Sequence, residues 1–265
     1  MICMDLIGSY SNGLVEVIHR VLAQPAVYKG AQAIADSMLK GGLVYLFGTG
    51  HSASVAVEPY HRSGGLAPVF HLADPALSMM APPAKATALE RLEGVAQALL
   101  LNSDVTRGDV LVVISNSGIN PVPVEMAMAG RTRGARVIAI VSAGHSAAQS
   151  PRHASGLKLT DVADIVVDNC APPGDALLRT DVSPEPMGGV STITGAAIVN
   201  AMTAQAAAIM AQAGVNPPVI VSSNTEHGDE KGARWLEAYR RPDVMRELLA
   251  ELISASSEQD LDPLD

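Results

Sequence analysis

Two short loops of the sequence carry glycine, hydroxyl and amide residues in an order that suits phosphate binding. The first loop reads Gly48-Thr49-Gly50-His51-Ser52, and the second reads Ser115-Asn116-Ser117-Gly118-Ile119-Asn120. Glycines let the backbone turn sharply, so that N–H groups and hydroxyls point into one concavity. Each loop is followed by a helical pattern, whose first N–H groups favour an anion. The second loop offers neutral donors and no positive charge.

The first loop alone leaves several interpretations open. The run GTGHSA, which begins at Gly48, matches the dinucleotide fingerprint G-x-G-x-x-A, with Asp74 as the acid for a ribose. It would then belong to a NAD-binding Rossmann-type enzyme. A glycine turn without a ligand is another alternative. Two phosphate-type loops at one crevice suit a terminal phosphate better than an extended dinucleotide, so we favour a phosphate site and expect no cofactor.

Short apolar runs that end at loops predict the strands that position these residues. Their ranges are 43–48, 69–72, 110–115, 137–142 and 165–168, with helical patterns over about 53–63, 87–101 and 122–132. Alternating strands and helices predict a three-layer α/β/α sandwich with a five-stranded parallel sheet and right-handed crossovers. In a doubly wound sheet of order 2-1-3-4-5 the first and third strands are adjacent. Both loops then lie at one crevice on the carboxyl edge.

Further helical patterns flank this core. Two helices are predicted within an N-terminal extension of about 1–41, and a long helix over 191–213 follows a loop at 171–189 that is rich in proline and glycine. Helices near 231–240 and 244–253 come last, and 219–222 is a candidate for one more strand. Residues 254–265 lack apolar periodicity and are predicted to form a disordered acidic tail. We therefore expect a single domain over 1–253.

Composition excludes some classes of function. The chain has 265 residues and a formal net charge of −9, without a cluster of Lys and Arg, so we expect no nucleic-acid partner. Its amino end lacks the pattern of a signal peptide, and Cys3 and Cys170 lack disulfide or metal spacing, which indicates a cytoplasmic protein. The apolar stretch 190–213 contains several Thr, Asn and Gln residues, which favours a buried or interface helix over a membrane span.

The segments FGTGHS and VISNSGxNP, the second led in by GDVLVVIS, resemble the SIS (sugar isomerase) domain family. The resemblance covers about residues 42–205 and points to a stand-alone bacterial subgroup with the flavodoxin-like SIS fold. In phosphoheptose isomerase, a relative, a serine of the first loop and an S-x-S-G-x-S loop hold the sugar phosphate. This implies Ser52, Ser115 and Ser117 as ligands, with Asn120 in place of a serine and Asn116 lining the loop. Asp74 would touch sugar hydroxyls.

The same relative supplies metal ligands from the helix that follows its first loop. A histidine and a glutamate four residues later match Glu58 and Arg62 here. Arginine cannot ligate zinc, so we expect no metal to carry over to this place. His51 and His61 together are weak evidence for a metal, because a hydrogen-bonded structural histidine is the commoner case.

An aldose–ketose isomerase needs a base that moves a proton between neighbouring carbons through an enediolate. Glu58 is the first candidate, because it follows Ser52 by about one and a half helical turns. The alternative is an ordinary i,i+4 ion pair with Arg62. Pro59 is expected to end this helix early or to kink it. Glu90, farther along the chain, is predicted to lie on a solvated helix face.

Four further acid or base residues are candidates for the same role. They are Glu93, Glu185, His227 and Glu230. Glu93 borders Gly94 and would look into a cleft or into solvent, and the residues at 226–230 form either a functional loop or a solvated acidic turn. Glu185 resembles a glutamate that several SIS isomerases carry before a Ser/Thr-rich helix. Ser191 and Thr192 begin that helix here, as phosphate ligands or, for Ser191, as an ordinary N-cap.

These residues predict a sugar-phosphate-binding protein, with isomerase or related lyase chemistry as the favoured activity. A phosphosugar sensor without chemistry is the alternative from a different class, because SIS domains also act as sensors. The chain carries no recognisable helix-turn-helix head, which favours the enzyme. The small residues of the 191–213 helix, together with the N-terminal helical pair, predict a homodimer or homotetramer.

Overall fold

Five short apolar runs form one parallel sheet, as the sequence predicts. The computed structural model describes residues 5–101 and 103–259, and its main sheet has the order β2-β1-β3-β4-β5. The strand bounds are Val44–Gly48 (β1), Val69–His71 (β2), Val110–Ile114 (β3), Arg136–Val141 (β4) and Ile165–Asp168 (β5). The predicted order is confirmed, and it places β1 beside β3.

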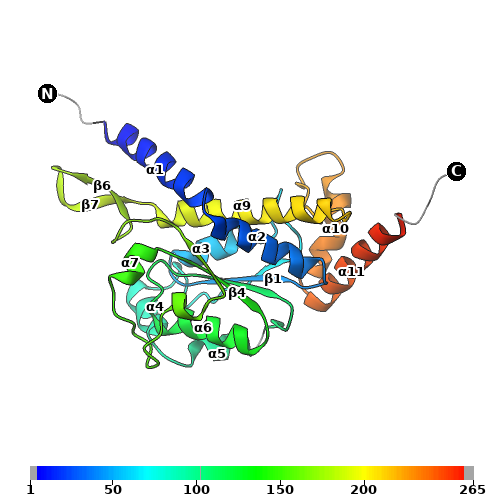
Figure 1. Ribbon diagram of the computed structural model, residues 1–265, viewed down its shortest axis with the longest axis horizontal. Helices are drawn as coiled ribbons and strands as arrows, with labels where there is room; N and C mark the ends of the chain where they lie inside the picture. The colour runs from blue at the N-terminus through cyan, green and yellow to red at the C-terminus, as the bar shows by residue number, and fades with distance from the viewer. Residues whose placement is uncertain (1–4, 102, 260–265) are drawn as a thin grey trace.

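Alternating side chains along each strand divide the apolar core between the two faces of the sheet. On β1, Val44 and Leu46 join one buried cluster, whereas Tyr45 and Phe47 join the other. Figure 1 shows α2 (Pro25–Met38), α3 (Ser52–Val57) and α9 (Ser191–Gln212) over one face. The opposite face is covered by α4 (Pro83–Glu90), α5 (Val95–Leu100) and α6 (Pro121–Thr132). The molecule is thus the predicted three-layer sandwich.

The long helix α9 belongs to this core. Within the described residues, it alone is long and apolar enough to cross a membrane, yet 44% of its most apolar window is buried inside the protein. It packs against α1 (Leu6–Leu22), α2 and α3. These contacts fit the predicted buried or interface helix, with one side packed into the domain.

Two predicted helices are shorter than expected. The helix after the first loop is predicted over about 53–63, but α3 ends at Val57, just before Glu58 and Pro59. Proline lacks an N–H and its ring clashes with the preceding turn, so the chain leaves the helix here. The segment predicted as one helix over 87–101 forms α4 and α5, which are separated by Gly94 with a φ of 88°.

The loop predicted over 171–189 instead contains a β-hairpin. Strands β6 (Ala176–Thr180) and β7 (Ser183–Gly189) pair antiparallel and lie beside α1, where the Tyr10 hydroxyl donates to the Gly189 carbonyl at 2.6 Å. The possible strand at 219–222 is reduced to one bridge between Leu66 and Val219. In both views of the molecule the hairpin and α7 (Ala143–Ala147) lie at one end of the sheet.

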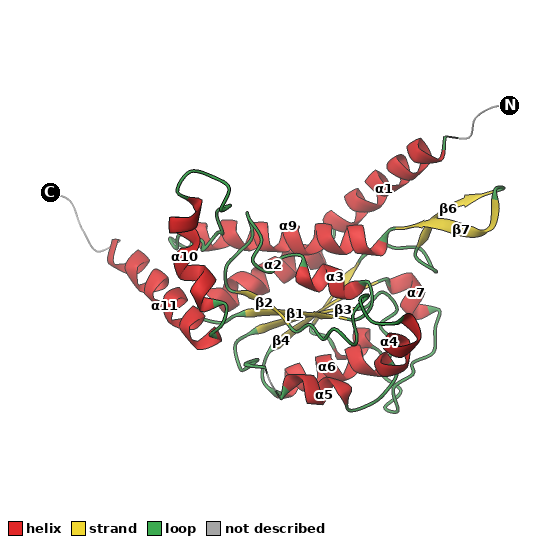
Figure 2. Ribbon diagram, turned by 180° about the vertical axis from the view of Figure 1, so that it is seen from behind, coloured by secondary structure: helices red, strands yellow, loops and turns green. Residues whose placement is uncertain are grey.

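The other end of the sheet carries the last two helices, α10 (Gly228–Ala238) and α11 (Pro242–Gln259) (Figure 2). The short helix α8 (Leu159–Val162) precedes β5. Since α11 continues to Gln259, residues 254–259 are helical and not part of a disordered tail; 260–265 lie outside the described residues. Arg246 of α11 donates to both carboxylate oxygens of the fully buried Asp109, each at 2.7 Å, just before β3.

Candidate functional site

The two loops singled out in the sequence begin side by side at the carboxyl edge of the sheet. Gly48 of β1 pairs with Ile114 of β3, so Thr49 and Ser115 leave the sheet at the same level. Gly48 is required here, because a Cβ at this position would collide with the backbone carbonyl of Ser52. The two loops therefore leave the sheet as neighbours, at the carboxyl edge where the sequence predicts a crevice.

The first loop is fixed by hydrogen bonds at Thr49 and Gly50, whereas the Ser52 hydroxyl at its end is not engaged by any described residue. Gly50 takes a φ of 53° and donates its N–H to the Leu77 carbonyl at 2.7 Å. The Thr49 hydroxyl donates to Glu90 Oε1 at 2.7 Å. Within the described residues, the Ser52 hydroxyl has no hydrogen-bond partner. Ser52 is thus the hydroxyl of this loop that is available to a ligand, whereas Thr49 is engaged.

Glu90 is predicted from the sequence to lie on a solvated helix face, and the structure corrects this. It is half-buried and accepts the Thr49 hydroxyl, which ties α4 to the first loop. The carboxylate lies 41 residues along the chain from Thr49, so no local pattern indicates the contact. His51, by contrast, is exposed and precedes α3 without a side-chain cap hydrogen bond.

The second loop is built more firmly. The buried Ser115 hydroxyl accepts the N–H of Gly118 at 3.1 Å, and Gly118 takes a φ of 64°. Asn116 accepts a hydrogen bond from the Asn169 amide at 3.0 Å. In the part of the chain that the structure describes, the Ser117 hydroxyl has no partner. Ser117 on the second loop, like Ser52 on the first, is therefore a hydroxyl that is available to a ligand.

The second loop contacts a positively charged residue, Arg152, through the side chain of Asn120. The buried Asn120 side chain accepts a hydrogen bond from Arg152 Nη1 at 2.7 Å, and the Arg152 N–H donates to the Ile119 carbonyl at 3.0 Å. The sequence predicted a neutral nest, and Arg152 corrects that prediction. A guanidinium at this loop favours the charged oxygens of a phosphate, for which its planar donor groups are well suited.

The start of α9 lies close to α3. A Cβ on Gly195 would stand 3.0 Å from a methyl group of Val55, so only a small residue allows this approach. Asp175 caps the helix, because it accepts both the N–H and the hydroxyl of Ser191 at 2.7 Å. Ser191 is therefore engaged in capping, as a donor to Asp175 and not as the N-cap itself. Thr192 is half-buried and has no side-chain hydrogen bond among the described residues.

A cavity of about 520 Å³ opens between α3 and the segment that follows β2. It is lined by Ala53, Ser54, Val57, Glu58, His71, Ala73, Asp74, Pro75, Ser78, Met79 and Met80. Glu58 lines this cavity, and the predicted ion pair with Arg62 is present. It accepts from Asn200 at 2.7 Å and pairs with Arg62 at 3.0 Å. Its side chain is 21% exposed, so the carboxylate stays within reach of the cavity.

His71 is a lining residue that the sequence did not reveal. It ends β2, and its ring packs edge-on against Tyr60 with centroids 4.3 Å apart. Its Nδ1 atom is buried without a hydrogen-bond partner among the described residues. Burial lowers the pKa of the imidazole below its ordinary value, which keeps the ring neutral. The available signal was its place at the end of a strand, in VFHLAD.

Asp74 lies in the same cavity and closes the turn after β2. Its Oδ1 accepts the Ala76 N–H at 2.7 Å. The zinc arrangement of the relative does not fit this region, because Arg62 holds the place of a ligand and its guanidinium neutralises Glu58.

The remaining candidates lie elsewhere within one chain. Glu185 is exposed on β7 of the projecting hairpin. His227 and Glu230 pair with each other at 3.2 Å at the start of α10, near the opposite end of the sheet. Their segment follows Ile220, which is hydrogen-bonded to Gly64 and Gly65 before β2 begins. The structure thus does not bring these residues to the carboxyl-edge crevice.

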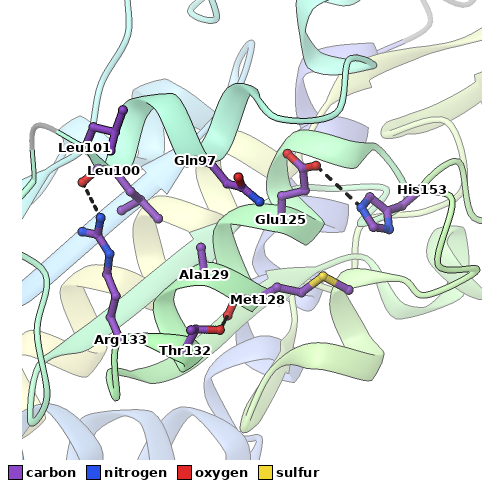
Figure 3. A pocket seen from close by; sticks show the side chains of 9 residues that line it. All are labelled: Gln97, Leu100, Leu101, Glu125, Met128, Ala129, Thr132, Arg133 and His153. Atoms are coloured by element: carbon purple, nitrogen blue, oxygen red, sulfur yellow. Dashed lines mark hydrogen bonds and ion pairs between the residues drawn. The ribbon is translucent and has the colours of Figure 1, made fainter.

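Glu93 is also separate from the Glu58 cavity. Its carboxylate accepts the N–H of Ala154 and lies near Glu125 and His153. Those two residues line another cavity, between α5 and α6 (Figure 3). Glu93 therefore does not line the Glu58 cavity, and its carboxylate contacts protein groups as well as solvent.

Comparison with known proteins supports the motifs described above. A family model described as SIS domain matches residues 9–142. A UPF0309 protein of Geobacillus thermodenitrificans is 40% identical over 212 residues, which cover 80% of this chain and 85% of that protein. A UPF0309 protein of Streptomyces coelicolor is 40% identical over 237 residues, 88% of this chain and 94% of that protein.

Among solved structures, a phosphoheptose isomerase from Francisella tularensis is similar with a TM-score of 0.49 and 17% identity. The similarity covers 77% of this chain and 98% of that chain. A phosphoheptose isomerase from Neisseria gonorrhoeae gives a TM-score of 0.44 and 20% identity over 77% of this chain and 95% of that one.

Proposed function

The chain belongs to the SIS domain family, and we propose that it binds a sugar phosphate at the carboxyl edge of its sheet. The phosphate would lie between the loops that begin at Thr49 and Ser115. The observation that carries this proposal is a pair of hydroxyls on adjacent loops, Ser52 and Ser117, which have no partner among the described residues. Arg152 adds a guanidinium that is hydrogen-bonded to Asn120 of the second loop. Neutral donors and one guanidinium together satisfy the oxygens of a phosphate monoester.

The cavity beside the first loop suits the sugar. Glu58, His71 and Asp74 line it, and a phosphate on Ser52 would lead the sugar chain past Ser54 toward them. We propose that Glu58 removes the proton from the carbon next to the sugar carbonyl, which gives an enediolate. Returning that proton to the neighbouring carbon completes an isomerisation. Expelling a group from the next carbon instead completes a lyase reaction.

His71 is proposed as the second proton-transfer group. A neutral imidazole can donate from one ring nitrogen and accept at the other. The lowered pKa keeps His71 in that form, and its ring lines the same cavity as Glu58. A proton donor beside the developing oxyanion would stabilise the enediolate.

A sensor that binds the sugar phosphate without turnover is the second candidate. One observation favours it: Glu58 is already paired with Arg62 and hydrogen-bonded to Asn200, so its carboxylate oxygens are engaged before a substrate binds. In the enzyme, this ion pair would have to loosen when the substrate binds. Solvent hydrogen exchange into a bound sugar phosphate distinguishes the two candidates.

The binding proposal is tested by thermal unfolding with panels of sugar phosphates and with NAD and NADP. A ligand at 100 times its dissociation constant stabilises a protein by about 2.7 kcal/mol. We expect at least one sugar phosphate to raise Tm and neither dinucleotide to do so. A rise with NAD and none with any sugar phosphate would restore the Rossmann-type interpretation.

Assembly and location are part of the proposal. The N-terminal helices leave Ile7, Val15 and Tyr28 exposed by 85%, 49% and 58%. With α9 nearby, this apolar surface suits a two-fold contact, so we propose a homodimer or homotetramer in the cytoplasm. Light scattering that gave a 27.4 kDa particle would contradict the assembly.

A further inference from the structure

Two carboxylates and an imidazole meet beside the cavity between α5 and α6. Glu93 comes from the turn before α5, Glu125 from α6, and His153 from the segment after α7. Their ligand atoms all lie within 4.8 Å of one another. The His153 Nε2 atom is 3.7 Å from Glu125 Oε1 and 4.0 Å from Glu93 Oε1. Figure 3 shows Glu125 and His153 facing each other at one end of this cavity.

This spacing fits a small cation. Metal–ligand bonds of about 2.0–2.2 Å place neighbouring ligand atoms about 3–3.6 Å apart. A slight inward movement of the Glu93 side chain, which is 47% exposed, would bring the three atoms to that distance. The ligands come from three separate segments of the chain, so an ion here would cross-link them.

Hydrogen bonds around the cluster hold each side chain in place. Glu125 accepts the Gly94 N–H with both oxygens at 2.8 Å, and Glu93 accepts the Ala154 N–H at 2.7 Å. The His153 Nδ1 atom is 2.7 Å from the Ser155 hydroxyl and 3.1 Å from the Ser155 N–H. Nδ1 accepts the Ser155 N–H in this structure, which places the imidazole proton on Nε2. A cation at Nε2 would displace that proton, and Nδ1 would then carry a proton and donate to the Ser155 hydroxyl.

A cation would also stabilise the two negative charges of the cluster. Glu125 is buried and His153 is half-buried, with side chains 9% and 12% exposed. Among the described residues, His153 is the one basic group within 4.0 Å of the Glu93 and Glu125 carboxylates, and a neutral imidazole leaves both carboxylates without a counter-charge. A buried carboxylate is costly unless a positive charge is close to it.

We propose that Glu93, Glu125 and His153 bind a divalent transition-metal ion, Zn²⁺ or Mn²⁺, with water completing its coordination. A mixture of imidazole and carboxylate ligands suits these ions. The bound ion fixes His153 and therefore the adjacent Arg152, which contacts Ile119 and Asn120 of the second loop. It is a structural ion, and it remains in place whether or not the carboxyl-edge crevice binds a sugar phosphate.

The test is titration of the chelator-treated full-length chain with Zn²⁺ and with Mn²⁺ by calorimetry. We expect one site per chain for at least one of the two ions. Glu125→Gln and His153→Gln should each weaken it by about tenfold or more. At saturating ion the wild-type Tm should rise by about 5–10 °C, and in the variants much less. Glu93→Gln alters an exposed side chain and keeps the experiment decisive if Glu125→Gln fails to fold.

His227→Gln is the matched control. His227 also lies near two carboxylates, Glu226 at 3.8 Å and Glu230 at 3.2 Å, but on one exposed segment outside the cluster. Its replacement should leave the affinity unchanged. The proposal is wrong if neither ion binds wild type at millimolar concentration, if the folded cluster variants bind as tightly as wild type, or if His227→Gln removes the site.

Discussion

The two sides of the carboxyl-edge crevice begin at the same level of the sheet but are held very differently. On the second side, Ser115, Asn116 and Asn120 are all hydrogen-bonded to neighbouring groups. On the first side, Ser52 is unpartnered among the described residues, and the chain opens into the cavity that Glu58 and His71 line. A preformed side binds without reorganisation, whereas acid–base groups need access to the reacting carbons. Changes on the second side should therefore alter binding, and changes on the first side should alter turnover.

Glu58→Gln provides the largest expected effect. With a sugar phosphate that binds, wild type should exchange hydrogen with deuterated water at the carbon beside the carbonyl. The variant should lose about 100-fold or more of this exchange, the usual scale of general-base catalysis, and still bind the ligand. Mass spectrometry of the recovered sugar phosphate measures the label.

Glu226→Gln, at an exposed carboxylate near the other end of the sheet, is the control and should exchange like wild type. Equal exchange in Glu58→Gln would assign the base to another residue, His71 first. No exchange by wild type with any ligand that binds would favour the sensor.

Gly48→Ala tests the backbone of the first side. The new methyl group would meet the Ser52 carbonyl, a backbone atom that cannot move away by a rotamer change. We expect a loss of about 3 kcal/mol in the free energy of unfolding. Gly118→Ala is the counterpart on the second side, where the nearest atom is a Val141 methyl at 3.3 Å and the φ of 64° supplies the strain.

For Gly118→Ala a smaller loss of about 1–2 kcal/mol is expected. Urea unfolding of both variants measures the difference. A larger loss of unfolding free energy in Gly118→Ala than in Gly48→Ala would contradict the conclusion that Gly48 is the more tightly packed of the two positions.

Ser117→Ala removes one donor from the preformed side. Sugar-phosphate affinity should fall by about 1–3 kcal/mol, with stability unchanged because this hydroxyl bonds to no described residue. Isothermal calorimetry measures it, and Ser223→Ala on the exposed segment before α10 is the control. Unchanged affinity in a folded Ser117→Ala protein would remove this loop from the phosphate site.

The smallest effect concerns His71 and pH. Its pKa is lowered from 6.5 in the folded chain, so the unfolded chain binds more protons below that pH. The contribution of His71 to stability is complete above pH 6.5 and declines as the pH falls from there through its lowered pKa. His71→Gln should therefore flatten the fall of unfolding free energy between neutral and mildly acidic pH. An unchanged slope would contradict the burial effect.

Most of the fold could be predicted from local patterns. Apolar runs such as VLVVI and VIAIV are bounded by glycine-containing loops, and both become central strands of the sheet. The hairpin β6–β7 escaped prediction because β7 (SPEPMGG) is rich in Pro and Gly, and because neither strand has a buried face that would give an apolar pattern. Its position depends on contacts with α1, which no local pattern encodes.

Candidate site residues could be placed from the sequence only where they directly follow a predicted strand of the sheet. Ser52, Ser117 and Glu58 follow adjacent strands or the helix after them, and their placement follows from the sheet. The Thr49–Glu90 and Asn120–Arg152 contacts join residues 41 and 32 positions apart, through segments without regular spacing. His227 and Glu230 were candidates for the active site because acid and base residues are dense in their segment, but such a segment is equally typical of an exposed turn.

The bond between Asp109 and Arg246 has a consequence for how the chain is completed on the ribosome. The carboxylate that opens the central strand β3 is synthesised 137 residues before the arginine that neutralises it. Until α11 emerges, Asp109 is either hydrated or buried without its counter-charge, and burial of a lone charge is strongly unfavourable. Nascent chains that end before α11 should therefore keep this edge of the sheet open to chaperones, and closure should coincide with the arrival of the last helix.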